Sequence, residues 1–326
     1  MTRLFIPVVH GAALDRPDER DTIEAAAAVA GSLRRLGYES EIVALGLDLS
    51  VLARLAERWP HVVFNLVEAL DGNGGLADLP LAVMDHLGLA YTGATRAAYA
   101  LSCSKLATKQ RILRHGVPTP GYWPRGDGVP SAARVIVKSV EEHASIGMDA
   151  DSVVSGKTAA AEVRRREARF GGQFFAEDYI EGREFNVSLI EMDDDVRVLP
   201  IQETLFTDFP AGRVAIVDYE AKWNPDSEVY NKTPRRFGVE ATEPDLAAML
   251  GRRAVACWKA LGLTGYARVD FRVSGAGDAL ALDVNANPCL GADAGFIAAT
   301  EQAGLAFDKV IRTVVDATTR VARKAA

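Results

Sequence analysis

The 326-residue chain lacks the features that mark membrane, secreted and nucleic-acid-binding proteins. No apolar stretch approaches the roughly 20 residues that a helix needs to span a bilayer. The apolar run at 4–9 is too short for a signal peptide and is expected to be a buried strand. The net charge of -7 argues against general binding to nucleic acid, which needs clustered Lys and Arg. We therefore expect a cytoplasmic protein with neither a membrane nor a nucleic acid as partner.

Cysteine and histidine are also scarce. The three cysteines, Cys103, Cys257 and Cys289, are widely spaced and form no CxxC motif, so reduced thiols are expected. The five histidines show no spacing typical of metal ligands. The basic run 164–166 lies in a helical pattern, and a solvated helix face is expected for it.

Two glycine-rich nucleotide motifs are missing as well. The first strand runs into His10-Gly11 instead of GxGxxG, and GxxxxGK[ST] is absent. The first ninety or so residues nevertheless alternate strands and helices, which is typical of a parallel, doubly wound sheet. The expected strands are 4–9, 41–45 and 61–67, and the expected helices are 21–36, 49–57 and 76–87.

A glycine-rich loop, 71–75, follows the third of these strands, and Glu68 stands beside it. It is either a simple turn or a stretch of backbone that lines a substrate site at the carboxyl end of the strand. We favour the substrate-facing loop, which makes Glu68 a predicted substrate-binding residue.

Residues 266–290 predict two strands joined by a Gly-rich turn. Apolar residues alternate with Arg268 and Asp270 in the first strand. The expected core face of the second strand is Leu280, Leu282 and Val284. Asp283 and Asn285 then share the other face, and antiparallel pairing can bring Asp270 opposite them. Their oxygens suit Mg²⁺. A solvated sheet face is the alternative, and it is less favoured because Asp283 ends an apolar strand.

A lysine ends the expected strand 134–138. Lys138 is followed by a loop of small residues that contains Ser145, and a positive charge beside exposed backbone N–H groups is what a polyphosphate site needs. Farther on, Glu177 and Glu184 bracket a turn between two strands. Residues 200–233 form a long connection, and lids are a common use of such segments.

Seven segments in the same order resemble the ATP-grasp superfamily, and within it the D-alanine:D-alanine ligase-like enzymes. They are VFNLVEALDGNGG, LGLAYTGATRAAYALSCSK, RVIVKSVEEHASIGM, FFAEDYIEGREFNVSLI, DYEAKW, GYARVDFRV and ALDVNANPCL. Several motifs in register are much more specific than any one of them.

The resemblance implies an α/β (α+β ATP-grasp) fold, in which a doubly wound parallel α/β domain precedes two α+β subdomains that clasp ATP. The implied ranges are 1–95 for the N-terminal domain, 96–183 for the central subdomain and 184–326 for the C-terminal subdomain, with its metal site and a lid at about 203–233.

The resemblance also implies an ATP site. The residues implied to bind the nucleotide are Lys105 and Lys138 for phosphates, Glu177, Tyr179 and Ile180 for adenine, Glu184 for ribose, and Lys222 from the lid. Asp270, Asp283 and Asn285 would hold two Mg²⁺ ions, for which Mn²⁺ could substitute.

Catalytic roles fall to Arg268, Lys222 and Ser145 by the same resemblance. Arg268 would stabilise an acyl phosphate and the tetrahedral intermediate that follows it, because it shares a strand face with Asp270. The lid would keep water away from the acyl phosphate.

The chain departs from the D-alanine enzymes where substrate binds. HGAALDRPDERD shows no clear equivalent of the glutamate that holds the first amino group, and Ala144 replaces the serine of the phosphate loop. Cys289 and Ala294 stand where the family has a glycine and a serine for the second D-alanine. The residues expected to bind substrate here are Glu68, Trp223, Asn287, Cys289 and Leu290. Cys289 is expected to line the pocket, with a nucleophilic role as the less favoured alternative.

We therefore predict an ATP-dependent carboxylate–amine ligase that forms an amide through an acyl phosphate, releases ADP and phosphate, and acts on small molecules other than two D-alanines. The alternatives are a D-alanine:D-alanine ligase of relaxed specificity and a non-catalytic ATP-binding regulatory protein. The resemblance also implies a homodimer.

Overall fold

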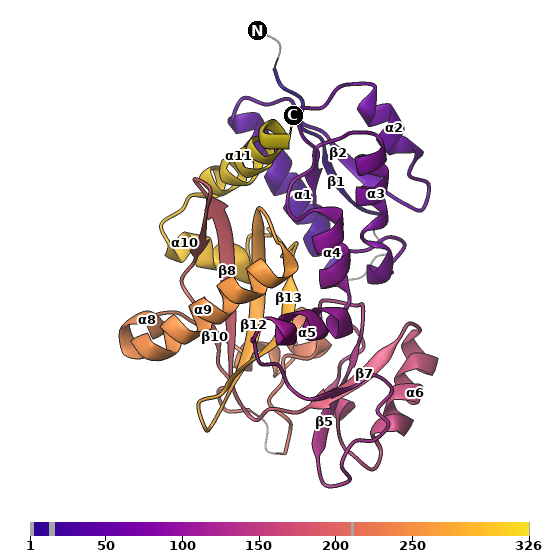
Figure 1. Ribbon diagram of the computed structural model, residues 1–326, viewed down its shortest axis with the longest axis vertical. Coiled ribbons are helices and arrows are strands. Elements are labelled where there is room, and N and C mark those ends of the chain that lie inside the picture. Colours follow the sequence, from indigo (N-terminus) through magenta and orange to yellow (C-terminus); the bar gives the residue numbers. More distant parts are fainter. Residues whose placement is uncertain (1–2, 13–16, 210–211, 326) are drawn as a thin grey trace.

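A computed structural model of the chain describes residues 3–12, 17–209 and 212–325, apart from the side chains of 17–19 and 321–325. Three β-sheets follow one another along the chain. The N-terminal sheet lies at one end of the molecule, and the sheet with β5 and β7 lies at the other (Figure 1). Each sheet falls within one of the ranges 1–95, 96–183 and 184–326, apart from residues 182 and 183, which begin a strand of the third sheet. We propose these three ranges as the domains.

The N-terminal sheet is parallel, with the strand order β2-β1-β3. Its elements are β1 (Val8–Gly11), α1 (Pro17–Arg35), β2 (Ile42–Leu45), α2 (Ser50–Ala56), β3 (Phe64–Asn65) and α3 (Leu79–His86). Val8 and Phe64 pack toward α1, whereas Val9 and Val63 pack toward α2 and α3. Helices therefore cover both faces, which confirms the doubly wound sheet. The strands are shorter than expected.

Two helices, α4 (Arg96–Cys103) and α5 (Lys105–Arg114), connect the first sheet to the next. Ser104 separates them, because its extended backbone ends α4 while its side chain accepts a hydrogen bond from Ala107 N and caps α5.

The middle sheet has the order β4-β7-β5-β6. Its elements are β4 (Tyr122–Trp123), β5 (Arg134–Ser139), β6 (Val153–Ser155), α6 (Ala159–Phe170) and β7 (Phe174–Asp178). The solvated helix face expected at 164–166 is wrong for Arg166, which is fully buried. Its guanidinium contacts Glu162 and Asp149 at 2.6 Å each and donates to Gly147 O, so it fixes the loop after β5 against α6.

The third sheet is antiparallel, with the order β11-β10-β8-β12-β13 and β9 beside β8. Its strands are β8 (Gly182–Met192), β9 (Asp195–Val198), β10 (Gln202–Thr204), β11 (Arg235–Arg236), β12 (Tyr266–Ser274) and β13 (Ala279–Asn285). The helices of this part are α7 (Tyr219–Trp223), α8 (Val239–Thr242), α9 (Pro244–Leu261), α10 (Gly295–Gln302) and α11 (Phe307–Ala325). Short 3-10 helices occupy Gly74–Leu76, Ala150–Ser152 and Tyr230–Lys232.

The β12–β13 hairpin confirms the predicted pairing of Asp270 with Asp283. The expected core face of β13 is wrong in part. Asp270 pairs with Asp283 but Phe271 pairs with Ala281, so Leu282 is the extra residue of a β-bulge. The bulge shifts the alternation, and Ala279 and Ala281 are buried in place of Leu280 and Leu282.

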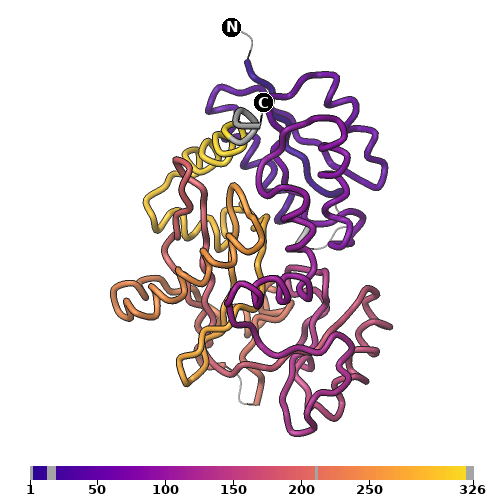
Figure 2. Tube along the Cα trace, viewed as in Figure 1, coloured from indigo at the N-terminus to yellow at the C-terminus, as the bar shows by residue number. Residues whose placement is uncertain are grey.

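The C-terminal helix α11 returns to the N-terminal domain (Figure 2). It packs with α1 in one hydrophobic cluster, and Arg35 on α1 pairs with Asp308 on α11 at 2.6 Å. The first and last helices therefore fix the N-terminal sheet to the C-terminal part of the chain. Over the described ranges, we find no helix with the length and apolar character that crossing a bilayer requires.

Candidate active site

A cavity of about 900 Å³ lies where the three sheets meet. Its size suits a nucleotide or another small-molecule ligand. The nucleotide end, named for the role that the resemblance implies, is lined by Lys105, Lys138, Glu177, Tyr179, Ile180 and Glu184. The substrate end is lined by Asp21, Glu68, Cys289, Asp293 and Ala294.

Glu177 is the most enclosed carboxylate of the nucleotide end, with 1% of its surface exposed. Its Oε1 pairs with Lys138 Nζ, and its Oε2 lies 2.7 Å from Lys109 Nζ. Burial raises the pKa of Glu177, but the two ammonium groups outweigh it, and the net pKa is lowered. The carboxylate is therefore held ionised in the protein interior.

Glu184 is held by an arginine that the sequence did not single out. Arg272 on β12 pairs with Glu184 Oε2 at 2.9 Å and donates to the carbonyls of Gly182 and Ala215. Arg272 connects the start of β8 with the lid, and only 4% of its surface is exposed.

The hairpin presents Asp270, Asp283 and Asn285 to the cavity. Asp270 Oδ1 accepts hydrogen bonds from Arg268 Nε and Asn186 Nδ2, each at 2.7 Å. Asp283 Oδ2 lies 3.5 Å from His143 Nδ1 and 4.0 Å from Lys105 Nζ. Lys105 lowers the pKa of Asp283 against the effect of burial, and His143 adds to this.

The chemistry of this donor set fits Mg²⁺. Within the parts of the chain that the structure describes, no three His, Cys, Asp or Glu side chains form a metal cluster. Asp270 and Asp283 pair across the hairpin and Asn285 lines the same cavity two residues farther along β13. Mg²⁺ usually takes only one or two protein carboxylates while phosphates and water complete its shell. Asp270, Asp283 and Asn285 are the residues that could hold it.

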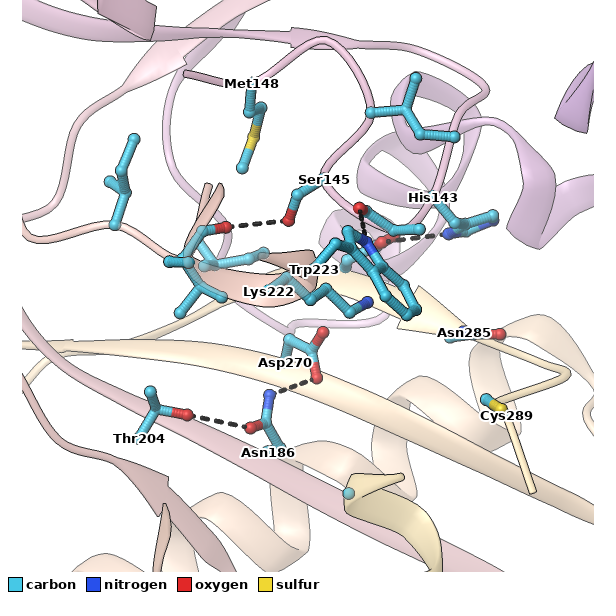
Figure 3. Close-up of a pocket in the computed structure, with 18 of the residues that line it drawn as sticks. His143, Ser145, Met148, Asn186, Thr204, Lys222, Trp223, Asp270, Asn285 and Cys289 are labelled. Atoms are coloured by element: carbon cyan, nitrogen blue, oxygen red, sulfur yellow. Dashed lines mark hydrogen bonds and ion pairs between the residues drawn. The ribbon is translucent and has the colours of Figure 1, made fainter. Parts of the chain in front are cut away.

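The lid is folded onto the loop after β5 (Figure 3). Trp223 Nε1 donates to Ala144 O at 2.9 Å, and Ser145 Oγ donates to Val217 O at 2.8 Å. Ala144 and Ser145 have φ values of 58° and 61°, a conformation that non-glycine residues seldom adopt. The turn directs the Ala144 carbonyl and the Ser145 hydroxyl toward the lid.

Lys222 extends from the lid between this loop and Asp270 (Figure 3). Its ammonium lies 5.1 Å from the centre of the Trp223 ring. Burial lowers the pKa of Lys222, and the nearby positive charge of Arg268 lowers it further. Two cations therefore face the same space, which suits them to an anionic ligand.

Cys289 lies at the substrate end, away from Met148 (Figure 3). Its thiol donates to Asp21 Oδ2 at 3.0 Å and accepts from Gly291 N at 3.2 Å. Burial raises the pKa of the thiol, and the negative charges of Glu68 and Asp21 raise it further. The sulfur is therefore held as a neutral thiol, which disfavours the nucleophilic role.

Two of the predicted substrate residues do not line the cavity. Asn287 is buried, accepts a hydrogen bond from the Tyr266 hydroxyl at 2.6 Å and donates to Val67 O at 3.3 Å. Leu290 is fully buried in the core between α1, α10 and α11. After β13 the chain turns inward, so of residues 286–292 only Cys289 lines the cavity. The other predicted site residues all line it.

Several cavity residues were missed by sequence reasoning. Asn186 had a usable signal, because period two on β8 places it on the same face as Glu184. Gln202 Nε2 donates to Asn186 Oδ1 at 2.8 Å and thereby orients the amide that binds Asp270. Asp21 and Asp293 had no signal, because packing of distant segments brings them to the cavity. Residues 13–16 of HGAALDRPDERD lie outside the described residues.

Known proteins resemble this chain in sequence and in fold. The model of a family described as "D-ala D-ala ligase C-terminus" matches residues 132–316. A D-alanine–D-alanine ligase of Chromohalobacter salexigens is 32% identical over 323 residues, covering 96% of this chain and 94% of the relative. The ATP complex of a Bacillus anthracis D-alanine–D-alanine ligase superposes with a TM-score of 0.76 at 18% identity, covering 99% of this chain and 100% of that one. VanG D-Ala:D-Ser ligase of Enterococcus faecalis has a TM-score of 0.71 at 15% identity, with 97% and 100% covered. The solved structures thus share the ATP-grasp fold of this chain.

Proposed function

Since the chain belongs to the D-alanine–D-alanine ligase family and is an ATP-dependent ligase that forms carbon–nitrogen bonds, we propose that it joins two small amino acids other than a pair of D-alanines. The observation that carries the catalytic part is that Arg268 donates two hydrogen bonds to Asp270 while Lys222 extends toward Asp270 from the lid (Figure 3). Family membership sets aside the non-catalytic alternative.

The first step activates a carboxylate, which is a poor acyl donor. A carboxylate oxygen of the first amino acid attacks the γ-phosphorus of ATP, the bond to the bridging oxygen breaks, and ADP leaves. Lys138 and Lys105 would neutralise phosphate charge, and Lys222 would do so from the lid. Mg²⁺, when bound by Asp270, Asp283 and Asn285, would supply further charge neutralisation at the phosphates.

The second step forms the amide. The amino nitrogen of the second amino acid attacks the acyl carbon, phosphate leaves with the bonding electrons, and the nitrogen loses a proton. Arg268 would stabilise the oxyanion, because Asp270 holds its guanidinium through two hydrogen bonds of 2.7 and 2.9 Å. The lid contacts of Trp223 and Ser145 would exclude water from the acyl phosphate.

Three observations support substrates other than two D-alanines. Cys289 fills space beside Asp21 at the substrate end. Ala294 precedes α10 without a side-chain hydrogen bond to the helix, in the place of the family's serine. A protein of the same fold is named a D-Ala:D-Ser ligase, so this architecture accommodates a second substrate other than D-alanine. Asp21 and Glu68 would bind the ammonium group of an amino acid.

The test is an ADP-release screen of paired amino acids and small carboxylic acids with ATP and Mg²⁺, followed by mass spectrometry of the products. We expect turnover with a pair other than two D-alanines and none with D-alanine alone. The relatives named D-alanine–D-alanine ligase favour the alternative, and turnover with D-alanine equal to the best pair would establish it. If no pair stimulates ADP release while ATP binds, the amide-forming proposal is abandoned. Light scattering would test the homodimer, which remains a prediction.

A further inference from the structure

Lys109 is a buried cation that the mechanism above does not use. It lies on α5, which runs between the sheet with β12 and β13 and the sheet with β5 and β7 (Figure 1). Only 1% of its surface is exposed. A lysine so enclosed loses the hydration of its charge, and a specific set of partners has to replace it.

The ammonium of Lys109 has a partner in each of three segments. It donates to Thr119 Oγ1 at 2.8 Å and to the Leu282 carbonyl on β13 at 3.2 Å. Its third partner is Glu177 on β7, at 2.7 Å. The first two contacts are hydrogen bonds, and the contact with Glu177 Oε2 is an ion pair. Lys109 therefore joins the middle sheet to the hairpin behind the nucleotide end.

Glu177 thus has two cationic partners that differ in access. Lys138 lines the cavity, whereas Lys109 approaches Glu177 from the protein side and does not line it. A triphosphate in the cavity would compete with Glu177 for the ammonium of Lys138, because the triphosphate carries more negative charge than one carboxylate. The competition would not reach Lys109.

We propose that Lys109 is a positioning residue: it is the permanent counter-ion of Glu177 and so allows Lys138 to leave that carboxylate for the ATP phosphates. The proposal rests on the proposed nucleotide roles of Glu177 and Lys138, and not on which amino acids are joined. This role explains why Glu177 lies between two lysines, although one positive charge would be enough to neutralise its carboxylate.

The charged groups around Glu177 give the proposal a measurable signature. They are Lys109 on α5, Lys138 on β5 and the carboxylate of Asp178, the next residue on β7, whereas Asp283 on β13 acts on Lys109. Without Lys109, the movement of Lys138 to ATP would leave Glu177 buried among like charges with no adjacent cation. Its pKa would then rise, and ATP binding would take up a proton.

The experiment is titration calorimetry of ATP binding at pH 7 without amino acids, in two buffers that differ in ionisation enthalpy. For wild type we expect no proton uptake attributable to Glu177. For Lys109→Met we expect uptake of up to about one additional proton and an ATP Kd about 10–100-fold weaker, as for loss of a buried charged partner. Lys157→Met removes an exposed lysine and is the matched control, with unchanged binding.

Lys109→Arg retains the positive charge and should therefore suppress the additional proton uptake. This holds even if the larger arginine side chain weakens ATP binding. If Lys109→Met binds ATP as wild type does, or binds weakly without extra uptake, the proposal is overturned. If Lys109→Met does not fold, Glu177→Gln is compared with the double variant Glu177→Gln/Lys109→Met. The proposal requires their ATP Kd values to agree within about threefold, and a further tenfold loss on removing Lys109 contradicts it. Because no amino acid is present, failure here is separate from failure of the proposed ligation.

Discussion

The two ends of the cavity are built in different ways. At the nucleotide end, carboxylates and cations are paired within the protein, as Glu177 is with Lys138 and Glu184 with Arg272. At the substrate end, carboxylates of the N-terminal domain, Asp21 and Glu68, meet the thiol of Cys289 from the segment after β13. The nucleotide end is a set of neighbouring strands with matched charges, whereas the substrate end depends on how distant segments pack. The first arrangement suits a fixed ligand, and the second can change with few substitutions.

The largest effect is expected at the hairpin that both ends share. Asp270→Asn should lower turnover by at least about 10³-fold, because it removes a carboxylate from the proposed metal site and weakens the hold on Arg268. Thermal unfolding should change little, since the residue keeps its size. Steady-state ADP release and a melting curve measure the two quantities.

The matched control is Asp278→Asn, which changes the same residue type in the exposed turn of the same hairpin. It should retain wild-type turnover. Near wild-type turnover in Asp270→Asn would refute the assignment of Asp270.

The contrast between the two ends predicts a separation of kinetic constants. Glu68→Gln and Asp21→Asn should each raise the KM for an amino acid by about 10–100-fold, the usual effect of losing a hydrogen bond to a charged group. The KM for ATP should stay within about threefold, because neither residue belongs to the nucleotide end. Equal changes in both KM values would show that the two ends are not independent.

A smaller effect is expected at the Cys289 thiol. Its pKa is raised by burial and by Glu68 and Asp21, so at pH 7.5 iodoacetamide should alkylate it at least about tenfold more slowly than free cysteine. Asp21→Asn removes one of the negative charges and should accelerate alkylation. Mass spectrometry of the labelled peptide follows the rate, and alkylation of Cys289 as fast as free cysteine would contradict the environment described here.

The smallest effect is expected at the pair of helices α1 and α11. These helices fix the N-terminal domain, which carries Asp21 and Glu68. The hydrogen bond from Arg35 lowers the pKa of Asp308 to about 2. A lowered carboxylate pKa gives stability that is complete above the ordinary value near 4 and is lost as the pH falls through 4 toward 2. Asp308→Asn should therefore lower Tm by at most a few degrees at pH 7, as is usual for an exposed pair.

The difference in Tm between Asp308→Asn and wild type should narrow between pH 4 and pH 2. A difference that is constant over this range would rule out the ion pair as its cause.

Sequence reasoning succeeded where function follows strand periodicity. The facing of Asp270 and Asp283 came from alternation on two strands joined by a short turn, and the pairing confirms it. The prediction that Leu282 lies in the core was wrong, because the β-bulge that shifts the alternation has no signature in the sequence. The prediction that Asn287 lines the cavity was also wrong, because its side chain is buried and accepts a hydrogen bond from Tyr266.

Asp21, Lys109 and Arg166 show a second limit of sequence reasoning. Each has partners on other segments, at distances along the chain that no local pattern encodes, although Arg166 also contacts Glu162 on its own helix. Charge runs misled for the same reason, since Arg166 stands in a basic triplet and is nevertheless fully buried.

The bulge at Leu282 has a consequence for engineering the hairpin. A bulge pins the register of a strand pair, because slipping by one residue would have to move the extra residue as well. Changes of length in the turn 275–277 should therefore leave the pairing of Asp270 with Asp283 unaltered. That exposed turn is a suitable place to graft a peptide tag or a reporter loop without displacing the side chains of the proposed metal site.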